Sequence, residues 1–446
     1  MFKTILVANT AEAFKGVLLK DKDTKTGAER IRHELALSQR AFFWESDDKV
    51  VITPYLIPLP LFELNKRICG FKNVANAAPS EGGVELSNAI AKDKQVRSLI
   101  AREARGNPQL TMSPYAVTRD FLGLSDQLQG EVPIQTKERP PDKSLWTVAY
   151  LDSKAGFRAE MLKLAAEHRE IKVPQGFVAQ DATEALTMAE WFYENGQSSI
   201  LKANFGESGW GIAIFKVESY PSLSAFRKQV RKLLQSDVIW QDTSIVVEQF
   251  IEPDASVAGG SPSTEFFVGE EGISLLYHCG QLLNEFGGFL GVEIGKGALS
   301  DTLARKLERI GNIIGKWYRE LGYRGFFDID FIVSRDGGIC VAETNTRRTG
   351  GTHTYDLARH LFGNRWENEA YLLSHDSFRY SKRRMVQDKA LLQKVKPVLY
   401  PMKGEKKGIV VTLISEWSPV MGYIVVASNP DEGRELQKRL FGLFKK

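Results

Sequence analysis

Two short runs of polar side chains, separated by a Gly-Gly turn, have the residue types and spacing of a chemical site. The first run contains Asp328 and Asp330, and the second contains Glu343, Asn345 and Arg347. Side chains two residues apart in a strand point to the same side. The two acids of the first run therefore share one face, as do the three residues of the second. We expect the turn to fold the strands together and to set Asp330 opposite Glu343.

Two carboxylates and one amide form an oxygen-only set that is typical of a magnesium site. Asp330, Glu343 and Asn345 are the predicted ligands of Mg²⁺, which prefers such oxygens together with water and substrate phosphates; Mn²⁺ would accept the same set. Arg347 adds a permanent cation suited to an acyl-phosphate or a phosphoryl group in transfer. The alternative is an exposed polar strand with acids that occur by chance. The apolar Ile-Cys-Val-Ala run before Glu343 argues against it, because charges that close a buried strand need partners.

The elements that must position these residues alternate between helices and strands, which predicts an α/β (α+β) fold. A long amphipathic helix is expected over 301–321, followed by strands over 326–333 and 339–343. A hairpin is expected over 265–283. Further helices are expected at 85–103, 154–168, 183–194 and 222–235, with strands near 408–414 and 422–427.

Asp330-Phe331 followed by Glu343-x-Asn345-x-Arg347 resembles the metal-binding signature of the ATP-grasp superfamily. The resemblance covers about 151–370 and implies an ATP-grasp fold with ATP and Mg²⁺ as cofactors. Such enzymes include biotin carboxylases, D-alanine–D-alanine ligases and amino-acid ligases.

The predicted domain organisation combines this resemblance with the length of 446 residues, which indicates two to four domains. A stretch rich in Gly, Pro and charge at 129–143 marks the first boundary. We therefore expect an N-terminal pre-ATP-grasp α/β domain at 1–150. An ATP-grasp domain would follow at 151–375, with a B subdomain at about 170–250. A small, basic α+β domain would close the chain at 376–446.

The nucleotide-binding parts of the superfamily can be matched in the same order along the chain. The resemblance assigns Lys154, at the start of a helix, and Lys202, at the end of a strand, to the phosphates. The glycine-rich loop matches Gly206, Ser208, Gly209 and Gly211, whose backbone N–H groups can cradle phosphates. Taken singly, a lysine at a helix start is usually a surface residue, and a glycine-rich loop is often only a hairpin turn.

The adenosine part of the predicted site follows the glycine-rich loop. The run at 246–251 matches the hinge that hydrogen-bonds adenine through its backbone. Asp254 occupies the place of a ribose-binding acid. The hinge residues assigned to the nucleotide are Glu248, Gln249, Phe250 and Ile251.

The substrate side of the site is predicted from the residues that follow Glu343, Asn345 and Arg347, which we call the metal row. The tandem arginines Arg347 and Arg348 precede a Gly-Gly turn, and with Lys202 they are the predicted catalytic residues. The tandem arginines would bind a substrate carboxylate, or else have a phosphate-binding or structural role. His353 is either a general base for the amine or an ordinary hydrogen-bonding residue. The glycine-rich stretch at 285–291 either lines an apolar slot or packs on itself.

The stretches 112–118 and 345–353 are similar to the pheganomycin-type peptide ligases. This resemblance implies a ligase that activates a carboxylate as an acyl-phosphate and couples it to the N-terminus of a peptide or amino acid. One alternative is a ligase for a small non-peptide amine or a carboxylase-like reaction. A second is a catalytically silent ATP-binding regulatory module, against which the retention of both lysines, the loop and the metal ligands argues.

The amino-acid composition limits the classes of partner that we expect for this protein. The net charge of +4, from 59 basic and 55 acidic residues, gives no reason to expect nucleic acid or an anionic membrane. The most apolar stretch, 50–62, contains three prolines and falls short of the roughly 20 residues that span a bilayer. Three widely spaced cysteines fit a reducing cytoplasm. The resemblance to ATP-grasp ligases implies small-molecule carboxylates with amines or peptides as the partners, in a cytoplasmic protein that forms a possible homodimer.

Overall fold

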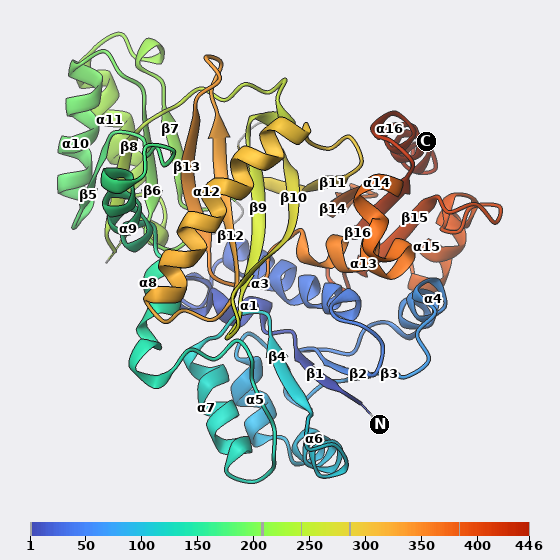
Figure 1. The fold of residues 1–446 in the computed structure, drawn as a ribbon. Coiled ribbons are helices and arrows are strands. Elements are labelled where there is room, and N and C mark those ends of the chain that lie inside the picture. The colour runs from blue at the N-terminus through green and yellow to red at the C-terminus, as the bar shows by residue number, and fades with distance from the viewer. Residues whose placement is uncertain (1, 207–208, 242, 285–286, 383, 446) are drawn as a thin grey trace.

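A computed structural model describes residues 2–206, 209–241, 243–284, 287–382 and 384–445. The N-terminal part is a parallel four-stranded sheet with the strand order β3-β2-β1-β4 and helices around it. The sheet lies beneath the rest of the molecule in the view of Figure 1. Its strands are β1 (Thr4–Val7), β2 (Lys49–Ile52), β3 (Val74–Ala77) and β4 (Thr111–Pro114). The helices are α1 (Thr10–Ala13), α2 (Lys15–Leu18), α3 (Lys25–Leu37), α4 (Leu59–Cys69), α5 (Leu86–Lys92), α6 (Lys94–Gly106), α7 (Arg119–Gln129) and α8 (Trp146–Asp152).

The single helix expected at 85–103 is two helices, so that prediction was wrong. Asp93 ends α5 in an extended conformation, and its side chain accepts hydrogen bonds from the backbone N–H groups of Gln95 and Val96. An Asp in this role is a strong helix N-cap and begins a new helix, α6.

The second part is a small antiparallel sheet with the order β5-β8-β6-β7. Two helices, α10 and α11, cover it on the outside, as Figure 1 shows in green. Its elements are β5 (Gly176–Ala179), α10 (Ala182–Glu194), β6 (Ser199–Ala203), β7 (Ile212–Phe215), α11 (Leu223–Leu234) and β8 (Ile245–Gln249), preceded by α9 (Lys154–Glu167). The expected helices of this region are confirmed to within a few residues.

The central sheet has eight antiparallel strands in the order β13-β12-β9-β10-β11-β14-β16-β15. The helix α12 packs on β9 and β10 and is amphipathic as expected. The strands are β9 (Pro262–Val268), β10 (Ile273–Leu283), β11 (Phe289–Gly295), β12 (Gly325–Val333), β13 (Ile339–Asn345), β14 (Tyr371–Arg379), β15 (Gly408–Ile414) and β16 (Val420–Ala427). The helices are α12 (Asp301–Glu320), α13 (Thr352–Phe362), α14 (Trp366–Glu369), α15 (Asp388–Val395) and α16 (Pro430–Gly442).

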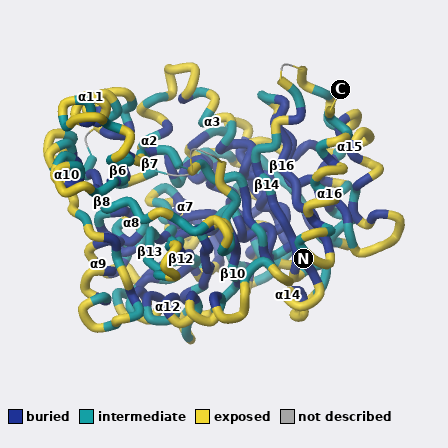
Figure 2. The backbone as a smooth tube through the Cα atoms, turned by 90° about the horizontal axis from the view of Figure 1, so that it is seen from above, coloured by how far each residue is buried: buried dark blue, intermediate teal, exposed yellow. Residues whose placement is uncertain are grey.

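The strands after residue 376 extend this same sheet. The expected boundary at 375/376 falls inside β14, which pairs with β11 on one side and with β16 on the other. One apolar core joins the N-terminal segment 41–44 to β14, β15 and β16. Figure 2 shows the buried residues gathered along these strands and the exposed ones along α10 and α11. Within the described residues, no helix is long and apolar enough to cross a membrane.

Candidate nucleotide and substrate site

A cavity of about 530 Å³ lies where the central sheet, the small sheet and helix α3 meet. One side carries residues of the predicted metal and nucleotide site. The other side is formed by residues of the N-terminal part and of β10, β11 and β14. The first group contains Lys202, Gly209, Phe250, Ile251, Asp328, Asp330, Glu343, Asn345 and Arg347, and the second His33, Glu34, Leu37, Arg40, Tyr115, Cys279, Phe289, Val292, Asp376 and Ser377.

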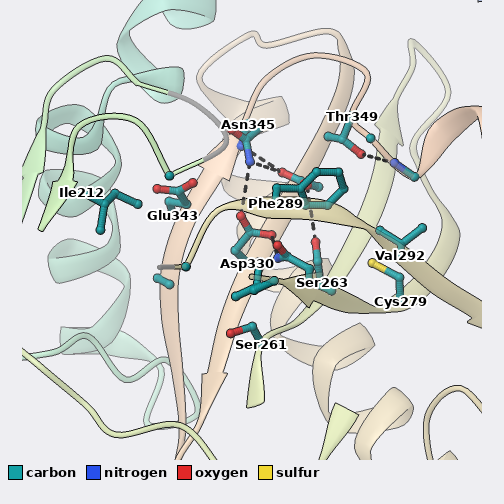
Figure 3. A pocket seen from close by; sticks show the side chains of 18 of the residues that line it. Ile212, Ser261, Ser263, Cys279, Phe289, Val292, Asp330, Glu343, Asn345 and Thr349 are labelled. Carbon is teal, nitrogen blue, oxygen red and sulfur yellow. Dashed lines mark hydrogen bonds between the residues drawn. The ribbon is translucent and has the colours of Figure 1, made fainter. Parts of the chain in front are cut away.

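The predicted metal ligands come from two adjacent strands, β12 and β13. The register sets Asp330 opposite Glu343 and Asp328 opposite Asn345, which confirms the expected pairing. Asn345 Nδ2 donates to Asp328 Oδ1 at 2.8 Å and to Asp330 Oδ2 at 3.4 Å. Gln281 Nε2 donates to the other oxygen of Asp330 at 2.6 Å. Figure 3 shows Asp330, Glu343 and Asn345 around the same end of the cavity.

The chemistry of this donor set fits a magnesium ion. Among the described residues, no group of three or more His, Cys, Asp or Glu side chains forms a metal-binding cluster. The candidate site is thus two carboxylates, Asp330 and Glu343, with the Asn345 amide beside them. The amide oxygen accepts from Arg347 Nη2 in this structure and would become the third metal ligand once the amide group turns over. Burial, with the charges of Asp328 and Glu343, raises the pKa of Asp330 well above its ordinary value. A divalent cation would relieve that repulsion.

The two predicted phosphate lysines flank Glu343 from different elements. Lys154 Nζ lies 3.3 Å from Glu343 Oε2, at a helix start fixed by the Ser153 side chain, which accepts from Gly156 N at 3.0 Å. Lys202 Nζ donates to Ala342 O at 3.1 Å. Burial raises the pKa of Glu343, but the nearby Lys154 and Lys202 ammonium groups outweigh this effect and hold the pKa below its ordinary value.

The glycine-rich loop reaches the cavity through Gly209, while Ser208 lies outside the described residues. Gly209 and Gly211 both have φ of +85°, a conformation that favours glycine. A methyl group added at Gly209 would lie 3.0 Å from Gly288 Cα. The loop therefore touches the second glycine-rich stretch, which lines the cavity through Gly287 and Phe289. Gly206 and Gly211 do not line it; a methyl group at Gly206 would meet Trp210 O at 2.2 Å.

Only the last two of the four hinge residues line the cavity, namely Phe250 and Ile251. The Glu248 side chain is buried between Arg158 and Lys202, with Lys202 Nζ at 2.8 Å from Oε2. Burial lowers the pKa of Lys202, but Glu248 and Glu343 outweigh it and the net shift is upward. Glu248 thus holds Lys202, the predicted phosphate lysine, in place.

The other two residues predicted to bind adenosine, Gln249 and Asp254, make local contacts instead. Gln249 N donates to Gln175 O at 2.8 Å within the small sheet. Asp254 Oδ1 accepts from Ser256 Oγ at 2.6 Å. Neither residue lines the cavity.

The tandem arginines point to different places. Arg347 lines the cavity, pairs with Asp152 and donates to Asn345 Oδ1 at 2.7 Å. Arg348 is 1% exposed and does not line the cavity. It bonds Pro114 O at 2.6 Å and Ser113 Oγ at 2.9 Å, which joins the metal-row loop to the N-terminal sheet.

His353 is fully buried and does not line the cavity either. Its Nε2 lies 3.5 Å from Asp376 Oδ1. Burial and the nearby Arg40 charge lower the pKa of His353 well below its ordinary value, so the ring is neutral at neutral pH. The structure therefore brings it behind the cavity wall rather than to a reacting amine.

The residues that sequence reasoning missed come from α3, from the turn after it and from β14. Glu34 and Arg40 line the cavity together with Asp376, and Arg40 Nη1 lies 2.6 Å from Asp376 Oδ2. The signal available was weak: a buried acid and a buried arginine in an otherwise ordinary N-terminal helical segment. Nothing in linear spacing links them to a strand more than 330 residues later.

No protein-family model and no curated protein sequence matches the chain. Solved structures match along almost its whole length. A biotin carboxylase from Campylobacter jejuni is 12% identical, with a TM-score of 0.51, over 99% of this chain and 91% of that one. A carboxyaminoimidazole ribonucleotide synthase from Aspergillus clavatus is 11% identical, with a TM-score of 0.54, over 99% and 98%.

A third match, N5-carboxyaminoimidazole ribonucleotide synthetase from Thermus thermophilus, is 13% identical, with a TM-score of 0.52, over 99% of this chain and 98% of that one. At these identities the matches establish the architecture and leave the subfamily to be proposed. The chain has the ATP-grasp fold, with a parallel N-terminal α/β sheet and antiparallel sheets in its central and C-terminal parts.

Proposed function

We propose that the protein is an ATP-dependent ligase that activates a carboxylate as an acyl-phosphate and couples it to an amine, the N-terminus of a peptide or amino acid. The observation that supports this most is the grouping at one end of the cavity. Lys154 and Lys202 flank Glu343, which stands opposite Asp330. The same cavity continues past this group and leaves room for a second substrate.

Each residue has a task in such a reaction. Asp330, Glu343 and Asn345 would hold Mg²⁺, which supplies charge neutralisation between nucleotide phosphates. Lys154 and Lys202 would hold those phosphates as point charges. Arg347, fixed by Asp152, would stabilise the charge on the acyl-phosphate. The carboxylate attacks the γ-phosphorus and ADP leaves; the amine nitrogen then attacks the acyl carbon, and phosphate leaves with a proton.

The structural neighbours support the cofactors. The Campylobacter jejuni enzyme was solved as a complex with an ATP analogue, and the Aspergillus clavatus enzyme with ATP. A Hydrogenobacter thermophilus biotin carboxylase domain, 15% identical with a TM-score of 0.50, was solved as a dimer with MgADP and bicarbonate. These structures support ATP and Mg²⁺ as ligands, and a homodimer as the assembly. They also keep a carboxylase-like reaction as the second candidate function.

The peptide or amino acid acceptor is supported by two sequence stretches that meet in space. The stretch 112–118 and the stretch 345–353 both resemble peptide ligases. Arg348 N donates to Tyr115 O at 3.0 Å, and the Arg348 side chain bonds Pro114 O. Tyr115 also lines the cavity. The two stretches are thus in contact beside the part of the cavity that lies beyond the metal row.

The test is release of ADP and phosphate from ATP and Mg²⁺ with panels of carboxylates, each with free amino acids, short peptides, small amines or bicarbonate. Release that needs both a carboxylate and a peptide or amino acid supports the proposal. Release that needs bicarbonate favours the carboxylase-like reaction. ATP binding without release for any combination would favour a silent ATP-binding module.

A further inference from the structure

The half of the cavity beyond the metal row has both apolar and charged side chains in its walls. Figure 3 shows the Phe289 ring between Asp330 and Asn345 on one side and the wall of Val292 and Cys279 on the other. Gly350 lies beside this ring: a methyl group there would meet Phe289 Cε1 at 2.4 Å and Asp376 Oδ2 at 3.6 Å. The loop after the metal row therefore runs directly into the wall that contains Asp376.

This half holds more acidic than basic side chains. Glu34, Arg40 and Asp376 line it and are only 5%, 4% and 4% exposed. Arg40 Nη1 pairs with Asp376 Oδ2 at 2.6 Å, which accounts for one carboxylate. The Glu34 carboxylate has no hydrogen-bond partner among the residues that the structure describes. His33, on the same helix, also lines the cavity and adds a positive charge only when it is protonated.

Asp376 itself has an unsatisfied atom. Its Oδ1 is buried and accepts no hydrogen bond within the described part of the chain. His353 Nε2 lies 3.5 Å away, but burial holds the pKa of His353 low, so this ring brings no charge. Burial also raises the pKa of Asp376, against the opposing charge of Arg40. That oxygen has almost no accessible surface and faces the buried His353, so a ligand in the cavity reaches the Glu34 carboxylate and meets Asp376 only through its charge.

We propose that Glu34, beside the negative charge of Asp376, binds the ammonium group of the amine substrate, with Leu37, Phe289 and Val292 around an apolar side chain next to it. An ammonium group brings three donors and a second positive charge to a wall where Arg40 stands against two carboxylates. The ligand class is therefore an amino acid or peptide with a free N-terminus and an apolar first side chain. The inference rests on the proposed function, because it names the acceptor of the same cavity.

Calorimetric titration of the full chain with ADP and Mg²⁺ present tests the site directly. The probe is L-leucinamide, which has an ammonium group and an apolar side chain. Two neutral analogues are compared with it: N-acetyl-L-leucinamide and 4-methylpentanamide. Because hydrogen bonds to charged groups are worth one to two orders of magnitude in affinity, L-leucinamide should bind at least about ten-fold more tightly than either.

Substitutions assign the effect to these residues. Glu34→Gln should weaken L-leucinamide about ten-fold or more, whereas Glu29→Gln, an exposed acid on the same helix, should leave its affinity unchanged. Asp376→Asn should also weaken it, with a melting curve to verify the fold, since Arg40 loses its ion-pair partner. Equal binding of the neutral analogues, no binding of L-leucinamide, or unchanged affinity in Glu34→Gln would overturn the inference.

Hydroxylamine separates this result from the proposed function. It captures acyl-phosphates as hydroxamates and is uncharged at neutral pH, so it does not need an ammonium site. With ATP, Mg²⁺ and the carboxylate panel, the wild type and the Glu29→Gln control should form hydroxamate at the same rate. Absence of hydroxamate in the wild type would count against carboxylate activation, while the calorimetric result would still decide the ammonium site.

Discussion

The guanidinium of Arg30 lies over the indole ring of Trp210, with its central carbon 3.9 Å from the ring centre. Arg30 belongs to α3, and Trp210 to the glycine-rich loop. Asp237 holds both, because Arg30 Nη2 lies 3.3 Å from its Oδ2 and Trp210 Nε1 donates to the same oxygen at 3.0 Å. Since α3 also carries Glu34 one turn further on, one helix contacts both the nucleotide loop and the substrate wall.

Arg30→Ala should loosen the glycine-rich loop. Cation–π contacts are worth about 0.5–2 kcal/mol, so ATP affinity should fall by about two- to thirty-fold. Fluorescence of Trp210, read as the difference from a Trp210→Phe variant, should show a more solvent-exposed ring. Arg32→Ala, an exposed arginine on the same helix, is the control. Unchanged ATP affinity would show that this contact does not position the loop.

Glu343→Gln should abolish turnover while the protein stays folded. The substitution removes a metal-facing charge and leaves Lys154 and Lys202 without their shared counterion, so the rate of ADP release should fall at least about a hundred-fold. Glu271→Gln, an exposed acid in the β9–β10 turn, should keep the wild-type rate. Substantial turnover in Glu343→Gln would refute the metal assignment.

Lys202→Met should act mainly on nucleotide binding. Methionine keeps the buried stem but removes the ammonium group, while Glu248 retains Arg158 as a partner. Loss of a charged phosphate contact should weaken ATP about ten-fold or more by calorimetry. Lys228→Met, at an exposed position of α11, gives the matched comparison. An unchanged ATP affinity in Lys202→Met would contradict a phosphate-binding role for Lys202.

Arg348→Met should lower stability rather than substrate affinity. Arg348 Nη1 lies 3.3 Å from Glu138 Oε1, and that buried acid would lose its cation. Breaking a buried pair costs about 3–5 kcal/mol, which urea unfolding can measure. Combination with Glu138→Gln should recover part of the loss.

The comparison for this prediction is Arg335→Met, an exposed arginine in the β12–β13 turn, which should leave stability unchanged. Loss of substrate affinity with full stability in Arg348→Met would restore the carboxylate-binding role that the sequence suggested.

Glu265 gives a pH dependence whose sign can be worked out. Burial raises its pKa from 4.5 to about 7, against hydrogen bonds from Thr349, Thr352 and Tyr277. Between these pH values the folded state keeps a proton that the unfolded chain has released. The free energy of unfolding therefore falls as pH rises from 4.5 to 7. Below this window the contribution is fully present, and above it the loss is constant.

Glu265→Gln cannot lose that proton. Its free energy of unfolding relative to the wild type should rise across the same window by up to about 3 kcal/mol. Urea unfolding at several pH values measures the difference. Asp328 contributes to it, because burial and the Glu265 charge raise the pKa of Asp328 and the variant lacks that charge. A difference that stays constant with pH would contradict the shift.

The sequence by itself determined the local parts of the site. Alternation along a strand sets which side chains share a face, so the spacing alone paired Asp330 with Glu343 across a turn. The predicted helix start placed Lys154. These features depend on neighbours within about one turn or one hairpin, and such short-range geometry can be read from spacing.

Only the tertiary structure decided which distant elements meet. Glu34 and Asp376 form one wall although more than 300 residues separate them, and Arg348 leaves the cavity although Arg347 next to it stays. Periodicity fixes the face on which a side chain lies, but not the element that packs against that face. That choice depends on how the N-terminal helix and the last strands share one core, and no local pattern contains it.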